Sequence, residues 1–277
     1  MTTDRPVAIV TGASSGIGME TAIAFARAGY AVVLAARREE RLQQAAEACR
    51  KENPDARALV CRTDVTDPQQ VNALVAAAKN QFGRIDVMVN NAGYGHFGAV
   101  HELSVDDMRA IFDVNYFGVF YGCKAVAPVM MAQRSGHIFN MSSLMGKFGA
   151  PFHGAYCATK YAVCGLSDSL RIELRPYNIH VTSVCPALTQ SEFPQHLRNA
   201  AARSASRIFS RLRRKPAGPV ARKIVKTTGK YKPNLIFTAG GRFICLAAAL
   251  CPGLTDRLLM RFRNDLARSI EQTTGQS

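Results

Sequence analysis

Short apolar runs alternate with longer stretches of helical periodicity over the first 185 residues. Four to seven consecutive apolar or small residues are typical of strands buried on both faces of a parallel sheet; the runs are Val7–Val10, Tyr30–Ala36, Ala58–Cys61, Ile85–Asn90, Ile138–Met141 and Ile179–Cys185. Between them the pattern predicts helices over about 20–28, 39–51, 69–82, 104–131 and 155–177. Alternation of this kind predicts a single α/β domain with a doubly wound, Rossmann-type parallel sheet of about seven strands and helices on both faces.

The last third of the chain has a different pattern. Further helices are expected over about 220–228, 243–250 and 254–270, and in the last of these Leu258, Phe262, Leu266 and Ile270 recur every four residues. We therefore divide the chain into a Rossmann-type domain over residues 1–240, which includes an arginine-rich segment at 187–219, and a basic helical extension over residues 241–277.

Positive charge is concentrated in that last third. Residues 1–194 hold 18 Lys or Arg and 17 Asp or Glu, whereas residues 195–277 hold 17 and 3, out of a net charge of +15. The basic amphipathic helix fits packing over the sheet or at a dimer interface, or peripheral contact with an anionic membrane. Nucleic acid is an unlikely partner because no binding motif accompanies the charge.

The eight cysteines form no C-x-x-C pair and lie mostly in apolar runs. We interpret them as core residues of a protein in a reducing, cytoplasmic compartment, and not as disulfide or metal ligands. The first residues do not have the pattern of a secretory leader, and no apolar run reaches the ~18 residues that a spanning helix needs.

A glycine-rich turn follows the first predicted strand. Thr11 to Gly18 reads TGASSGIG and leads into a helix. Glycines let a backbone approach a pyrophosphate, and the helix amino terminus presents free N–H groups to it. The sequence therefore predicts a dinucleotide site at this turn.

Two arginines stand where many NAD-binding folds have an acid. The second strand ends at Ala36 and is followed by Arg37 and Arg38. A guanidinium group can grip a ribose 2′-phosphate with two hydrogen bonds, which favours NADP(H) over NAD(H). The alternative is that these arginines only cap a loop. Asp64, after the third strand, suits either an adenine contact or an ordinary helix cap.

Ser143, Tyr156 and Lys160 carry the candidate chemistry. Tyr156 and Lys160 are four residues apart in a predicted helix, so they share a face. A nearby cation favours the phenolate and lowers the tyrosine pKa, which makes the hydroxyl usable in acid–base catalysis. Ser143, at a strand end, can hold a carbonyl. Taken alone, Tyr-x-x-x-Lys is more often a surface pair. Asn115 lies on an apolar background and is either structural or holds a water.

With these positions placed, the chain resembles the short-chain dehydrogenase/reductase family over residues 6 to about 192. TGASSGIG, the NNAG of residues 90–93, Asn115, Ser143 and Tyr156-x-x-x-Lys160 occur in the family's order and spacing. The resemblance implies that Tyr156 exchanges the proton, Ser143 orients the carbonyl, Lys160 lowers the tyrosine pKa and binds the nicotinamide ribose, and Asn115 holds a relay water. It also implies that residues 1–240 are a dinucleotide-binding and catalytic domain with a substrate loop at 187–219. The implied cofactor site is formed by Gly12, Ser14, Ser15, Gly16, Ile17, Gly18, Arg37, Arg38, Asp64, Val65, Asn91, Ala92, Gly93, Tyr156, Lys160, Pro186 and Ser191.

Two departures from the family pattern bear on function. Pro186-Ala187 replaces Pro-Gly, and Ser191 replaces a frequent threonine, although its hydroxyl can still donate to a carboxamide. The tail lacks the Asp-Gly-Gly ending of acyl-carrier reductases and is more similar to that of members acting on lipophilic alcohols and ketones. We expect a homodimer or a homotetramer. Because the tail differs from that of the acyl-carrier reductases, the sequence does not indicate which surface joins the subunits.

The sequence thus predicts an NADP(H)-dependent oxidoreductase acting on a lipophilic small-molecule ketone or secondary alcohol of steroid, retinoid or long-chain type. Its pocket is expected to be lined by Tyr94, His96, Phe97, Ser143, Phe148, Phe152 and His153. The alternatives are a 3-oxoacyl-carrier-protein reductase and a non-catalytic NADP-binding protein.

Overall fold

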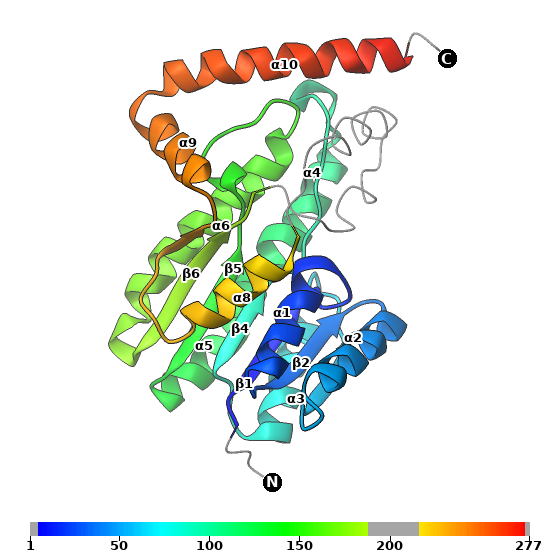
Figure 1. Cartoon of the computed structure of the whole chain (residues 1–277), viewed down its shortest axis with the longest axis vertical. Coiled ribbons are helices and arrows are strands. Elements are labelled where there is room, and N and C mark those ends of the chain that lie inside the picture. The colour runs from blue at the N-terminus through cyan, green and yellow to red at the C-terminus, as the bar shows by residue number, and fades with distance from the viewer. Residues whose placement is uncertain (1–4, 188–215, 275–277) are drawn as a thin grey trace.

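A single parallel sheet forms the centre of the molecule (Figure 1). The computed structural model describes residues 5–187 and 216–274. The sheet has seven strands in the order β3-β2-β1-β4-β5-β6-β7, and every neighbouring pair is parallel. Their bounds are β1 (Val7–Thr11), β2 (Ala31–Ala36), β3 (Ala58–Arg62), β4 (Val87–Asn90), β5 (Gly136–Met141), β6 (Ile179–Cys185) and β7 (Asn234–Ile236). The predicted doubly wound sheet is confirmed.

Helices cover both faces of this sheet because alternate strand residues point to opposite sides. Ala8 and Val10 pack against α1, α2 and α8, whereas Val7 and Ile9 pack against the layer of α3, α5 and α6. The helices are α1 (Gly16–Arg27), α2 (Glu39–Glu52), α3 (Pro68–Phe82), α4 (Val105–Phe112), α5 (Gly118–Gln133), α6 (Gly154–Glu173) and α8 (Gly218–Thr227). Strands buried on both faces explain why the sequence shows continuous apolar runs and not alternation.

The strand order reverses beside β1, which pairs with β2 on one side and β4 on the other. In open parallel sheets, ligands bind outside the carboxyl ends of the strands at this switch point. The glycine-rich turn after β1 and the segment that follows β4 both lie there. The topology therefore places the predicted cofactor residues beside one another.

The long helix expected over 104–131 contains one wider turn. Between α4 and α5, residues Asp113–Phe117 form a π-helical turn with Asn115 at its centre. π-turns recur at functional sites because the extra residue displaces a side chain from the regular helix face. Here the displaced side chain is that of Asn115, which is fully buried.

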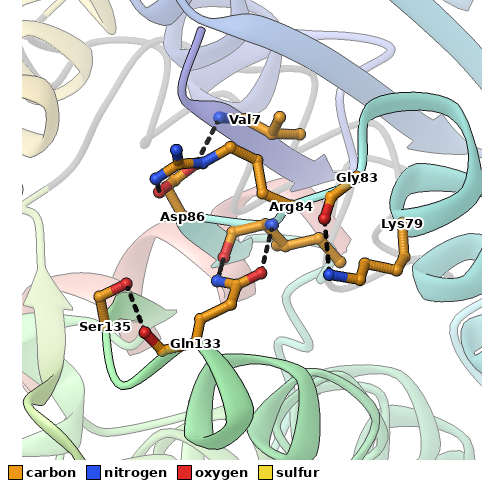
Figure 2. Close-up of polar contacts among 8 residues, drawn as sticks. Val7, Lys79, Gly83, Arg84, Asp86, Gln133 and Ser135 are labelled. Atoms are coloured by element: carbon orange, nitrogen blue, oxygen red, sulfur yellow. Dashed lines mark hydrogen bonds and ion pairs between the residues drawn. The ribbon is translucent and has the colours of Figure 1, made fainter. Parts of the chain in front are cut away.

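Polar contacts fix the start of β4 at the opposite, amino edge of the sheet (Figure 2). The Asp86 carboxylate accepts hydrogen bonds from the Val7 backbone N–H at 2.8 Å and from the Arg84 guanidinium. The Gln133 amide both accepts from the Ile85 N–H at 3.0 Å and donates to the Ile85 carbonyl at 2.7 Å. These contacts hold β1, β4 and the end of α5 in register, and they lie away from the catalytic edge.

The carboxyl-terminal segment forms two helices at one end of the molecule (Figure 1). They are α9 (Ala239–Leu250) and α10 (Pro252–Thr274), close to the predicted bounds. Within the described residues, no helix combines the length and apolar character needed to cross a bilayer.

Candidate active site

Ser143 and Tyr156 meet at the carboxyl edge of the sheet. Ser143 follows β5 and caps a short 3-10 helix, η3 (Leu144–Gly146), where its Oγ accepts from the Met145 N–H at 3.2 Å. Tyr156 lies in the first turn of α6 and is 8% exposed. The two hydroxyls are hydrogen-bonded to each other. The end of β5 and the first turn of α6 thus bring these two hydroxyls together.

The Lys160 ammonium lies one helical turn beyond Tyr156 and is almost fully buried. Its Nζ is 5.5 Å from the centroid of the Tyr156 ring and donates to the Met141 carbonyl at 2.9 Å. The same β5–α6 contact is strengthened by Ser142, whose Oγ donates to the Lys160 carbonyl at 3.0 Å. The end of β5 thus sets the position of the lysine relative to the tyrosine.

Burial dominates the electrostatics of this pair. It raises the pKa of Tyr156 above its ordinary value, and the hydrogen bond from Ser143 opposes that rise. The predicted lowering of the tyrosine pKa by Lys160 is therefore wrong for this arrangement, because desolvation of the buried phenol outweighs the nearby cation. Burial also lowers the pKa of Lys160 to about 8. At neutral pH the phenol is protonated and can donate, while the lysine still carries its charge beside it.

Asn115 joins three segments through its side-chain amide. The Oδ1 accepts from the Tyr94 N–H at 2.9 Å, and the Nδ2 donates to the Tyr94 carbonyl at 2.8 Å and to Thr159 Oγ1 at 3.2 Å. The π-turn therefore anchors the segment after β4 to α6. This contact supports the structural role left open by the sequence; the relay-water role remains a prediction.

The glycine-rich turn packs directly against the NNAG segment. Gly12 has a φ of +66°, and a Cβ there would lie 2.8 Å from Asn91 Nδ2 and 2.9 Å from Ala92 Cα. The hydroxyl of Thr11 accepts from the N–H groups of Asn91 and Ala92 at 2.9 and 3.2 Å. Only glycine fits this conformation and this approach. Thr11 was not among the predicted site residues, although its place at the end of β1 was a usable signal.

Arg38 folds back onto the glycine-rich turn. One of its guanidinium nitrogens is 3.1 Å from Ser14 Oγ and 3.2 Å from Ser15 Oγ. Ser15 stands at the amino terminus of α1 without capping it through its side chain. Arg37 is exposed at the end of β2. The structure thus places one guanidinium, two hydroxyls and a helix amino terminus together, which is a donor set suited to phosphate.

The other predicted cofactor residues follow the strand ends. Asp64 accepts from the Thr66 N–H at 3.0 Å through Oδ1, and it is Asp67 that caps α3, so the helix-cap alternative for Asp64 is wrong. Val65 is buried under the start of α5. The carbonyl of Pro186 accepts from the Leu144 N–H at 3.2 Å. Ser191 and most of the predicted substrate loop lie outside the described residues.

Two loops beside Tyr156 bring the predicted pocket residues together. The Phe97 ring lies 5.6 Å from the Phe152 ring and 5.2 Å from the His153 ring, and the Gly98 N–H donates to the Phe152 carbonyl at 2.8 Å. Phe97 is 2% exposed and therefore supports the loops from beneath. Burial lowers the pKa of His153, which keeps the imidazole neutral. His96 and Phe148 are partly exposed on the same two loops.

An apolar cluster around Tyr156 was missed by the sequence analysis. Ile111, Ala155 and Tyr156 form its buried part, against which partly buried apolar side chains pack: Tyr94, Leu103, Met108, Phe112 and Met145. Most of these residues come from α4 and the segment before it, whose helical pattern gives no sign of proximity to residue 156. The surroundings of the phenol are therefore mainly hydrocarbon.

Comparison with known proteins agrees with this arrangement. The model of the short chain dehydrogenase family matches residues 6–202. Dehydrogenase/reductase SDR family member 7B of Rattus norvegicus is 32% identical over 270 residues, covering 95% of this chain and 81% of its own. An uncharacterized oxidoreductase of Staphylococcus saprophyticus is 40% identical over 193 residues, covering 69% and 77%.

A solved structure gives the same result. A short chain dehydrogenase/reductase from Burkholderia phymatum, in complex with NAD, superposes with a TM-score of 0.80 at 29% identity, covering 90% of this chain and 96% of its own. The family match spans strands β1 to β6, the glycine-rich turn and the Ser143–Tyr156–Lys160 group described above. The chain therefore belongs to the short-chain dehydrogenase/reductase family of oxidoreductases.

Proposed function

We propose that this protein is an NADP(H)-dependent oxidoreductase that interconverts a carbonyl and a secondary alcohol on a lipophilic small molecule. The observation that carries the proposal is the hydrogen bond between Ser143 and Tyr156, with the Lys160 ammonium 5.5 Å from the phenol ring. These three groups stand at the carboxyl edge of the sheet, beside the glycine-rich turn. That is where a nicotinamide and its substrate would meet in this fold.

The side chains divide the proton chemistry among them. When bound, the nicotinamide supplies or accepts the hydride. In the reductive direction, Tyr156 donates its phenolic proton to the substrate oxygen, and the Ser143 hydroxyl holds that oxygen in place. The Lys160 ammonium stabilises the phenolate that remains, because an opposite charge nearby favours the ionised form. Oxidation is the same exchange in reverse.

Arg38 and the two serines support a preference for NADP(H). A 2′-phosphate is the feature by which NADP differs from NAD, and a guanidinium beside two hydroxyls offers several charge-assisted hydrogen bonds to it. Arg37, exposed at the neighbouring position, would add a second cation. The solved structure of the Burkholderia phymatum protein contains NAD. That complex describes the cofactor of the Burkholderia protein and does not assign a cofactor to this chain.

The apolar cluster supports a lipophilic substrate. Side chains such as Ile111, Met108 and Met145 offer hydrocarbon contact around Tyr156, and binding sites for apolar ligands are lined mainly in this way. A steroid, a retinoid or a long-chain ketone fits this chemistry. A carrier-bound 3-oxoacyl chain is the second candidate because it also presents a ketone on an aliphatic chain. We further propose a homodimer or homotetramer.

A substrate screen tests the proposal. Oxidation of NADPH and of NADH would be followed separately with steroids, retinoids, long-chain ketones and 3-oxoacyl thioesters, including a carrier-linked thioester. We expect turnover with a lipophilic ketone and a preference for NADPH. Turnover confined to the carrier-linked substrate would favour the second candidate, and cofactor binding without turnover on any ketone would favour a non-catalytic role.

A further inference from the structure

The helix α9 is apolar on all sides and yet lies on the surface. Its sequence, AGGRFICLAAAL, contains one charged residue, Arg242, and only Gly241 is buried. Phe243, Leu246 and Leu250 are 73%, 58% and 71% exposed. A helix that is hydrophobic all round is normally buried in a core or a membrane, and exposed apolar patches mark interaction sites. Among the described residues, α9 contacts α10 and approaches Leu144 through Gly241, and these contacts leave Phe243, Leu246 and Leu250 exposed.

The exposed apolar row continues into α10. Only Cys251 lies between the two helices, and its carbonyl accepts from the N–H of Leu254 in the first turn of α10 at 3.1 Å. Leu254 and Leu258, one turn apart, are 56% and 55% exposed. We call the five side chains Phe243, Leu246, Leu250, Leu254 and Leu258 the α9–α10 apolar surface. It belongs to the two helices at one end of the molecule, where α10 runs across that end from the last residue of α9 (Figure 1).

The charges beside this surface are almost all positive. Between residues 239 and 264 the chain has four arginines and one aspartate, and all five side chains are exposed. Arg257 and Arg261 are one residue and three residues away from Leu258, at the edge of the apolar row. Two copies of the chain meeting through α9 and α10 would bring eight arginines together, which disfavours self-association through this surface.

We propose that the α9–α10 apolar surface docks onto the interface of an anionic lipid bilayer. Aliphatic side chains enter the boundary between headgroups and acyl chains, and the flanking arginines bind lipid phosphates. A protein partner would require hydrogen-bonding groups, at about one per 100–200 Å², and apart from Arg242 the α9 side chains offer little of this. The contact is peripheral, because a 12-residue helix spans only ~18 Å of the ~30 Å hydrocarbon core.

The position of α9 places the proposed membrane contact next to the catalytic edge of the sheet. Gly241 approaches Leu144, the residue after Ser143, so closely that a Cβ would lie 3.1 Å from a Leu144 methyl carbon. A docked molecule would therefore hold its catalytic edge beside the bilayer, where lipophilic compounds accumulate. The use of this placement rests on the proposed function, whereas the docking itself does not.

Vesicle sedimentation of the full chain tests the proposal. The probes are phosphatidylcholine vesicles with and without phosphatidylglycerol, at low and high salt, and the test variant is Leu246→Ser/Leu250→Ser. We expect binding to the anionic vesicles, weakening at high salt because exposed charges are screened, and roughly tenfold or greater loss in the double variant. Ile172→Ser, which alters a side chain that is also 73% exposed but lies near the end of α6, should bind as the parent does.

Three outcomes would overturn the proposal. They are an absence of binding to anionic vesicles, equal binding by the parent and the double variant, and equal loss in Ile172→Ser. Sedimentation velocity of the same proteins without lipid provides the other arm, because a dimer lost only in the double variant, together with no vesicle binding, would assign the surface to a second copy. NADPH binding by each variant checks folding, and none of these readouts requires turnover.

Discussion

The Lys160 ammonium donates a 2.9 Å hydrogen bond to the carbonyl oxygen of Met141, the last residue of β5. This bond holds a buried cation one turn from Tyr156, at the position that the proposed chemistry requires. Burial lowers the pKa of Lys160 to about 8 from an ordinary 10.5. Keeping Lys160 charged at neutral pH therefore lowers the stability of the folded state.

That loss of stability predicts a variant that is more stable and inactive. Because the folded pKa is depressed, the folded state binds the proton less tightly than the unfolded state, so stability falls as pH drops from about 10.5 to about 8. Lys160→Met should raise the unfolding free energy of the cofactor-free protein by ~1–3 kcal/mol at pH 7. This range already subtracts the hydrogen bond to the Met141 carbonyl that the substitution removes. The gain should shrink toward pH 10, and turnover should be lost. Urea unfolding at both pH values is the measurement, and a gain that does not change with pH would contradict the explanation.

Cofactor choice is predicted to depend on Arg38 and Arg37. Arg38→Ala removes the guanidinium beside Ser14 and Ser15, so it should weaken NADPH binding by ~1.5–3 kcal/mol more than NADH binding. Arg37→Ala should shift the preference in the same direction. Fluorescence titration with both cofactors gives the ratio. Equal weakening of NADPH and NADH would show that neither arginine binds the 2′-phosphate.

Burial of the His137 imidazole should make the free energy of unfolding fall at acidic pH. Its Nδ1 accepts from the Gly229 N–H at 3.1 Å, so its Nε2 carries the proton and faces Thr182 Oγ1 at 2.8 Å. Burial, aided by nearby His180, lowers the pKa of His137 to about 3. Only the unfolded chain then gains this proton below about pH 6.5, and stability falls as pH drops toward 3, by at most ~1.4 kcal/mol per pH unit.

His137→Gln should remove that component of the pH dependence. The slope of unfolding free energy against pH, measured between pH 6 and 4, should become shallower than in the parent. The exposed His101→Gln serves as the matched control. Parallel slopes for the parent and His137→Gln would mean that another group causes the loss.

The close approach of α5 to β4 predicts a sharp glycine requirement. A Cβ at Gly122 would lie 2.0 Å from Asn90 Oδ1 and 2.9 Å from the Met88 terminal methyl. Gly122→Ala should therefore destabilise the fold by ~1–3 kcal/mol, the usual cost of overpacking. Gly165→Ala, in α6 with open space around the added methyl, should be neutral or stabilising by up to ~1 kcal/mol. Thermal unfolding compares the two variants, and similar melting temperatures would contradict the predicted clash.

The central sheet could be predicted from the sequence because its strands are buried on both faces. Runs such as those of β1 and β2 have no polar interruption, and the intervening helical periods fix the parallel topology. Because all neighbouring strands are parallel, their carboxyl ends bring Gly12, Ser143 and Pro186 to one edge of the sheet. Bounds differed by only a few residues where a 3-10 or π-turn follows a helix.

Other features depend on geometry that the residue pattern does not encode. The π-turn at Asn115 has the same apolar pattern as a regular helix. The sequence also gives no sign that the Arg38 guanidinium turns toward Ser14. Asp64 suited a helix cap by its place after a strand, but the hydrogen-bond geometry gives that cap to Asp67, which the sequence analysis did not consider. The apolar composition of α9 is typical of a buried helix, so its exposure is a property of the assembled fold.

The most direct measurement of the central claim is the turnover of Tyr156→Phe beside its binding of NADPH. The substitution removes one hydroxyl from a buried ring that keeps its packing. We predict unchanged NADPH affinity within a few-fold and a loss of turnover of at least ~100-fold, the scale of general acid catalysis. Turnover within tenfold of the parent, on the same substrate and with NADPH bound, would contradict the assignment of the proton transfer to Tyr156.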